Sequence, residues 1–187
     1  MLSFTTPDDS ISCPFMAKVA IARTIKAIES TCWKRLKVVS PRLSFSADVL
    51  SRNSEATIIC VHDAARPFAS ATVYQRVIGA VVDGNDGAVP GVAVTDTIKQ
   101  VNSSDVVIET PQRATLRAIQ TPQAFRASTL RRAHEKNAEG TDDAALVEAI
   151  GGTVLVVQGD ELNRKITTRD DLDWARAHAH DQLFGEV

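Results

Sequence analysis

An acid and a base stand close together in the segment HDAARPF, residues 62–68, which follows an apolar, β-branched run at residues 57–62. Such a run is typical of a strand covered on both faces, and ligands bind beyond the carboxyl ends of parallel strands. Asp63 and Arg66 are therefore candidates for binding a hydroxyl, a metal or a phosphate. A structural salt bridge within the loop is the equally supported alternative.

Five more polar residues are candidates for such a site. Thr97 and Arg113 lie on or beside an expected hairpin, and Thr121 precedes a proline, which favours extended backbone. Thr141 begins the run TDDAALVE, whose helix N-terminus is able to receive an anion. Lys165 follows an expected strand and is a possible phosphate ligand. The alternatives are surface positions for the two cations, a turn at Thr121 and an N-cap at Thr141.

Helices and strands alternate along the chain. Apolar periodicity predicts helices over residues 17–31, 71–83, 123–137, 142–150 and 169–183. Strands are expected at residues 36–40, 57–62, 88–101, 105–109 and 153–158, the third and fourth of them forming a hairpin. Gly84 is expected to cap a helix, and Thr168 and Asp171 are spaced as a capping box. The alternation favours an α/β fold with a mainly parallel sheet.

The composition is that of an ordinary globular domain. The 187 residues carry a net charge of −2, with 44% hydrophobic and 24% charged residues, which argues against a nucleic-acid-binding protein with a broad basic face. No apolar run approaches the roughly 20 residues of a membrane helix. Cys13, Cys32 and Cys60 are too few and too scattered for a disulfide scaffold or a zinc site. We therefore expect a cytoplasmic protein whose residues 1–16 are poorly ordered.

Five segments occur in an order that resembles one family. They are HDAARPF, VAVTDTIKQV, RATLRAIQTPQAFR, TDDAALVEAIGG and NRKITTRDDLDWA. The chain resembles the 2-C-methyl-D-erythritol 4-phosphate cytidylyltransferase family of the non-mevalonate isoprenoid pathway, closely over residues 57–180 and loosely over residues 17–50. The ribitol-5-phosphate cytidylyltransferases share HDA-x-RP, DTI, QTPQ and N-x-KITT and are an alternative, although RATLRAIQTPQAFR fits the first family better.

The resemblance implies a Rossmann-like nucleotidyltransferase sheet with helices on both faces and a projecting β-arm at about residues 90–117. It implies Mg²⁺-dependent transfer of CMP from CTP to the acceptor phosphate, with release of pyrophosphate and without a covalent enzyme intermediate. Arg113 and Lys165 would be the catalytic residues that hold the acceptor. The residues that would line the same pocket are Asp63, Arg66, Thr97, Thr121 and Thr141. The arm would embrace a second subunit in a homodimer and lend Thr97 and Arg113 to its site.

The sequence departs from the family at the CTP side. The family begins with a strand and a Gly-rich loop followed by a lysine, whose N–H groups and charge hold the triphosphate, whereas the first glycine here is Gly79. Pro41 also runs directly into Arg42 where the family has a Gly-Gly segment, and Phe45 stands at a serine position. We therefore expect residues 17–187 to form a single incomplete nucleotidyltransferase domain, N-terminally truncated and without the first strand and Gly-rich loop.

Two functional hypotheses follow. One is an enzyme, either with an unusual CTP site or shortened only in the recorded reading frame. The other is a non-catalytic remnant that binds a sugar phosphate or a partner subunit.

Overall fold

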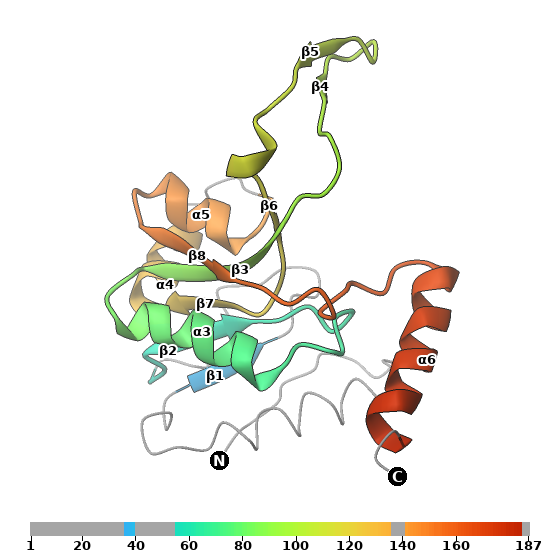
Figure 1. The fold of residues 1–187 in the computed structure, drawn as a ribbon. Coiled ribbons are helices and arrows are strands. Elements are labelled where there is room, and N and C mark those ends of the chain that lie inside the picture. The colour runs from blue at the N-terminus through green and yellow to red at the C-terminus, as the bar shows by residue number, and fades with distance from the viewer. Residues whose placement is uncertain (1–35, 40–54, 136–140, 185–187) are drawn as a thin grey trace.

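The computed structural model describes residues 36–39, 55–135 and 141–184 (Figure 1). The strands are β1 (Leu36–Val39), β2 (Ile58–Val61), β3 (Gly87–Ala93), β4 (Gln100–Val101), β5 (Val107–Glu109), β6 (Arg117–Ile119), β7 (Gln123–Arg126) and β8 (Val154–Gln158). The helices are α3 (Ala71–Val82), α4 (Ala127–Glu135), α5 (Asp143–Ala149) and α6 (Arg169–Phe184), with a short 3₁₀ turn at Arg113–Thr115. The helix expected at residues 17–31 and the poor order expected at residues 1–16 lie outside the described residues.

The central sheet is mixed rather than mainly parallel. Its strand order is β1-β2-β7-β3-β6, and β8 pairs with the other edge of β3. The β1–β2 and β3–β8 pairs are parallel, as predicted, but β7 lies antiparallel between β2 and β3. The prediction of a mainly parallel sheet is therefore wrong among the described strands.

Strand β7 also corrects the helix predicted over residues 123–137. Residues Gln123–Arg126 are extended, and the helix begins only at Ala127. Gln123, Ala124 and Phe125 are buried within the sheet. Pairing and burial on two sides outweigh the local preference of this short segment for a helix.

Helices cover both faces of the sheet, as predicted. Neighbouring residues of one strand alternate between two apolar clusters, because successive side chains in a strand point to opposite faces. One cluster holds Ile59, Val61 and Phe125 together with residues of α4 and α5. The other holds Cys60 and Ala124 together with residues of α3. The sheet is thus the middle layer of three, with helices packed on both of its faces.

The predicted hairpin is present as an arm that projects from the body (Figure 1). It carries the short β4–β5 ladder, whose turn is closed by Asn102: its side-chain Oδ1 accepts from Ser104 N–H and Val106 N–H, each at 3.0 Å. The strand predicted over residues 88–101 is divided, because β3 ends at Ala93 and β4 begins at Gln100. At its base, Gly91–Ala93 pair with Arg117–Ile119.

Two of the three predicted helix caps are confirmed. Gly84 follows α3 with a φ of 119°, a left-handed conformation that favours glycine. Thr168 and Asp171 form a reciprocal capping box, with Asp171 N–H donating to Thr168 Oγ1 at 3.1 Å and Thr168 N–H donating to Asp171 Oδ2 at 2.9 Å. The N-cap of α5 is Asp142 rather than Thr141, because Asp142 Oδ1 accepts from Ala145 N–H at 2.9 Å.

No helix in the described part of the chain is both long and apolar enough to span a membrane.

Candidate functional site

The segment after β2 forms a tight turn that presents Asp63. The carbonyl oxygen of Asp63 accepts from Arg66 N–H at 2.9 Å, and its Oδ1 accepts from Ala65 N–H at 3.0 Å. A carboxylate that bonds the backbone two residues on is an Asx turn, which fixes both the loop and the side chain. The free edge of the carboxylate, Oδ2, is therefore held in one place at the end of the strand.

Lys165 meets this carboxylate across the sheet end. Its Nζ lies 3.0 Å from Asp63 Oδ2. The neighbouring Ile166 N–H donates to Ala65 O at 2.8 Å. The structure thus brings the side chains of Asp63 and Lys165 into direct contact. Lys165 is half exposed, with 51% of its side chain accessible. It is therefore a cation accessible to an anion arriving from solvent.

Asp63 is a carboxylate at neutral pH. Partial burial acts to raise its pKa, but the hydrogen bonds from Ala65 N–H and Lys165, together with the charges of Lys165 and Arg66, hold the pKa below its usual value. The group therefore offers hydrogen-bond acceptors to a ligand.

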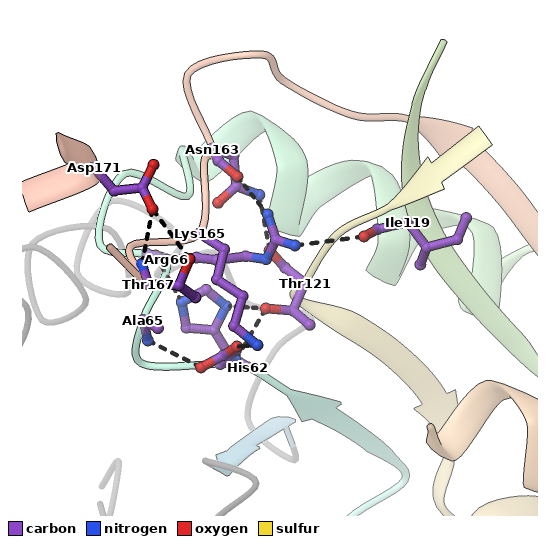
Figure 2. A network of polar contacts seen from close by, with 10 residues as sticks. His62, Ala65, Arg66, Ile119, Thr121, Asn163, Lys165, Thr167 and Asp171 are labelled. Carbon is purple, nitrogen blue, oxygen red and sulfur yellow. Dashed lines mark hydrogen bonds and ion pairs between the residues drawn. The ribbon is translucent and has the colours of Figure 1, made fainter. Parts of the chain in front are cut away.

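Arg66 links its own loop to the loop of Asn163 and to the end of strand β6. Its guanidinium donates to Asn163 O at 2.7 Å and to Ile119 O at 3.5 Å (Figure 2). The side chain is half-buried, so these contacts replace lost water contacts. Arg66 was predicted to line the pocket, and in the structure the hydrogen bonds of its guanidinium go to the backbone carbonyls of Asn163 and Ile119.

Thr121 joins the site from the segment between β6 and β7. Its Oγ1 accepts from Asp63 N–H at 2.9 Å, and its carbonyl oxygen accepts from the side chain of Asn163 at 2.8 Å. The Thr121–Pro122 peptide is cis. The structure thus places Thr121 beside Asp63.

Two residues of this network were missed by the sequence analysis. Asn163 is fully buried and links Thr121 to the loop that carries Lys165. His62 is also buried and contacts both Thr121 Oγ1 and Arg66 O. Both residues lie inside the quoted motifs. His62 directly precedes Asp63, and Asn163 lies two residues before Lys165. This proximity to predicted site residues was the available signal.

Helix α6 holds the loop of Lys165 from the far side. The Arg164 guanidinium lies 4.7 Å from the centre of the Trp174 ring and 3.4 Å from Asp171 Oδ1. Phe68, which follows the Asp63 turn, packs edge-on against Trp174 with ring centres 5.5 Å apart. Such cation–π and aromatic contacts restrain both the first loop and the Lys165 loop.

Three predicted site residues lie apart from this cluster. Thr97 and Arg113 are exposed on the arm, where Arg113 donates to Thr95 O at 2.6 Å. Thr141 is exposed before α5. Among residues 55–135 and 141–179, no hydrogen bond or ion pair connects these three to Asp63 or Lys165.

The described residues supply no cage for a metal ion. Within them, no group of three or more His, Cys, Asp and Glu side chains is placed to hold one. We therefore assign no residue to Mg²⁺.

Comparisons with known proteins agree with one another. The profile of the family described as IspD, 2-C-methyl-D-erythritol 4-phosphate cytidylyltransferase, matches residues 44–180. A bifunctional IspD/IspF enzyme of Nitratidesulfovibrio vulgaris is 47% identical over 127 residues, covering 66% of this chain and 31% of that protein. A 2-C-methyl-D-erythritol 4-phosphate cytidylyltransferase of Nocardia farcinica is 45% identical over 123 residues, covering 66% of this chain and 54% of that protein.

A solved structure shows the same fold. The crystal structure of 2-C-methyl-D-erythritol 4-phosphate cytidylyltransferase from Thermus thermophilus superposes with a TM-score of 0.61 at 31% identity, over 78% of this chain and 81% of that one. The chain spans about a third and about half, respectively, of the length of the two curated relatives named above. Its profile match nevertheless covers most of its residues, including every segment of the Asp63–Lys165 site. The chain belongs to the 2-C-methyl-D-erythritol 4-phosphate cytidylyltransferase family.

Proposed function

We propose that this protein serves isoprenoid precursor biosynthesis as a cytidylyltransferase whose acceptor is 2-C-methyl-D-erythritol 4-phosphate. The observation that carries the proposal is the contact of Lys165 with Asp63, which places a cation beside fixed hydrogen-bond acceptors at the sheet end. This combination suits a polyol phosphate, because the phosphate binds to a cation and the hydroxyl groups donate hydrogen bonds to acceptors. The relatives named for this activity support the choice of acceptor.

The chemistry would be an in-line displacement. An oxygen of the acceptor phosphate attacks the α-phosphorus of CTP, a new phosphorus–oxygen bond forms, and the bond to the β-phosphate breaks with release of pyrophosphate. Mg²⁺ would enter with the triphosphate and neutralise charge on it. Lys165, with the Arg113 of a second copy, would hold the acceptor phosphate. Asp63 and Thr121 would orient the hydroxyl groups, so that the protein contributes position and charge rather than a covalent intermediate.

The alternative function is binding of the sugar phosphate without transfer of CMP. Residues 1–78 contain no glycine and hence no Gly-rich loop of the kind that wraps a triphosphate. Binding and turnover must therefore be measured separately.

Replacing Lys165 by alanine should weaken binding of methylerythritol phosphate. The lost charge-assisted contact contributes about 1.5–3 kcal/mol, with the lower end expected here because the side chain is half exposed. Titration calorimetry at fixed ionic strength measures the change. Arg169→Ala is the matched control, since it removes a cation that is 80% exposed on α6 and paired only loosely with Asp173, at 4.0 Å. Equal affinities of wild type and K165A for methylerythritol phosphate would show that Lys165 is only a surface residue. The same titration with ribitol 5-phosphate tests the alternative acceptor.

The arm should mediate a homodimer. Its tip exposes Val106, Val107 and Ile108, with Val106 58% accessible. A projecting hairpin has no neighbour of its own to cover such residues, and a second copy would remove them from water. Light scattering on the wild type should give the mass of two chains. The triple variant V106S/V107S/I108S should give the mass of one.

Val82→Ser is the control for the arm variant. Val82 is 60% accessible but lies on α3, away from the arm, and its replacement should leave the dimer intact. A monomeric wild type, or a triple variant that stays dimeric, would contradict assembly through the arm.

A further inference from the structure

The imidazole of His62 lies directly behind the Asp63–Lys165 site. The residue is only 2% exposed, and both ring nitrogens have partners. Nε2 lies 3.1 Å from the carbonyl oxygen of Arg66, and Nδ1 lies 3.1 Å from Thr121 Oγ1 (Figure 2). The ring therefore bridges the turn that presents Asp63 and the segment that presents Thr121.

The partners of the ring determine where its proton lies. A carbonyl oxygen only accepts, so the contact with Arg66 O requires a proton on Nε2. Burial lowers the pKa of His62 to about 4, against the opposing effects of the Arg66 carbonyl and the Asp63 charge, and the Arg66 charge lowers it further. Tyr74, whose ring centre lies 5.6 Å away, completes the wall of this site. The ring is thus neutral at pH 7, and its Nδ1 has only a lone pair.

An unprotonated Nδ1 fixes the orientation of the Thr121 hydroxyl group. The hydroxyl has one proton, which it donates to Nδ1, while one of its lone pairs accepts from Asp63 N–H at 2.9 Å. One lone pair is left for a ligand. Toward the site, Thr121 is therefore an acceptor like the carboxylate of Asp63, and it has no proton left to donate.

We propose that His62 is a positioning residue that, in its neutral Nε2–H tautomer, locks the Thr121 hydroxyl as an acceptor and so selects ligand hydroxyl groups at this end of the site. The selection of hydroxyl groups rests on the proposed function, whereas the tautomer and the lock do not. Lys165 supplies the complementary preference for an anion. The site thereby distinguishes the two ends of a polyol phosphate: Lys165 donates to the phosphate, and Thr121 and Asp63 accept from the hydroxyl groups.

Nitrogen-15 spectra of labelled histidine side chains test the lock in the ligand-free protein. At pH 7, His62 should show a protonated, pyrrole-type Nε2 and an unprotonated, pyridine-type Nδ1. Its signals are assigned by their loss in His62→Gln or, should that variant not fold, by elimination with His134→Gln, His178→Gln and His180→Gln. Thr121→Val removes the donor at nearly constant volume and should shift the Nδ1 signal toward that of a ring nitrogen without a hydrogen bond. Thr121→Ser should restore it.

The opposite spectra would overturn the proposal. These are a proton on Nδ1, a doubly protonated ring at pH 7, or an Nδ1 signal that does not move in T121V.

Ligand binding distinguishes positioning from a merely structural role. T121V should weaken methylerythritol phosphate about 3- to 10-fold, the loss of one hydrogen bond, and leave inorganic phosphate unchanged because phosphate is bound by the cations of the site and not by Thr121. Equal losses for both probes would mean that the variant only disturbs the fold and would overturn the selection. A wild type that binds neither probe would overturn the proposed function and the selection with it, while the spectra still decide the tautomer.

Discussion

The 187-residue chain, mixed with CTP, Mg²⁺ and methylerythritol phosphate, should release negligible pyrophosphate. Transfer of CMP requires the triphosphate to be held while charge develops on the leaving group. Lys165 supplies one cation, but the sequence before Gly79 contains no glycine to form a cradle of N–H groups. Removing one preorganised donor from an active site costs a factor of about 10²–10³ in rate. Losing several leaves little above background, even though such losses are not additive.

A pyrophosphate-release assay tests this directly. The Nocardia farcinica cytidylyltransferase, of which this chain spans 54%, serves as the positive control. Calorimetry with methylerythritol phosphate on the same preparation shows whether the acceptor site is intact. Turnover near that of the control would contradict the prediction and show that residues 1–54 hold CTP by another arrangement. Binding without turnover would favour the second function proposed above.

Acid should destabilise the protein between about pH 6.5 and pH 4 through His62. The pKa of this side chain is lowered from 6.5 to about 4 by burial in the native state. Within that window the unfolded chain binds a proton that the native state does not, so the free energy of unfolding falls as pH falls. Above pH 6.5 neither state binds it and the contribution is complete. The loss across the whole window is about 3 kcal/mol.

Urea unfolding at pH 7 and pH 4.5 measures the effect. His62→Gln should be less stable than wild type at pH 7, because it loses the contacts to Thr121 and Arg66, and should lose less stability on acidification. Asp63, whose pKa lies below its usual value, loses its contribution only at lower pH, so the chosen window separates the two groups. If the variant and the wild type lose equal stability, His62 does not control the acid transition.

The sequence was most informative where one strong pattern determined one element. In α3, Val73, Val77, Ile78 and Val81 recur at helical spacing within the predicted helix, and all four are buried. Strand β7 was missed because the four-residue segment QAFR, followed directly by helical residues, is too short to show a period of its own. Its extended state comes from β2 and β3, which approach it from both sides. Information of that kind lies in partners distant along the chain.

The site shows the same division. Asp63, Thr121 and Lys165 could be named from motifs because their residue types are those that bind hydroxyl groups and phosphates. His62 and Asn163 could not be named in this way, because the sequence does not show whether a polar residue is buried or exposed. Only the closed fold shows that Asn163 donates to Thr121 O and that Arg66 donates to Asn163 O.

The closure at the base of the arm has a consequence for how such proteins diversify. Residues Gly91–Ala93 pair with Arg117–Ile119, so the sheet is complete beneath the arm whatever lies between them. Changing the length of a closed loop is cheap, at about 0.6 kcal/mol for each doubling. Mutation can therefore lengthen or shorten the tip of the arm, beyond these paired ends, without opening the sheet beneath it. The β4–β5 tip and the central sheet are separate sheets of one chain, so they are inherited together but can change at different rates.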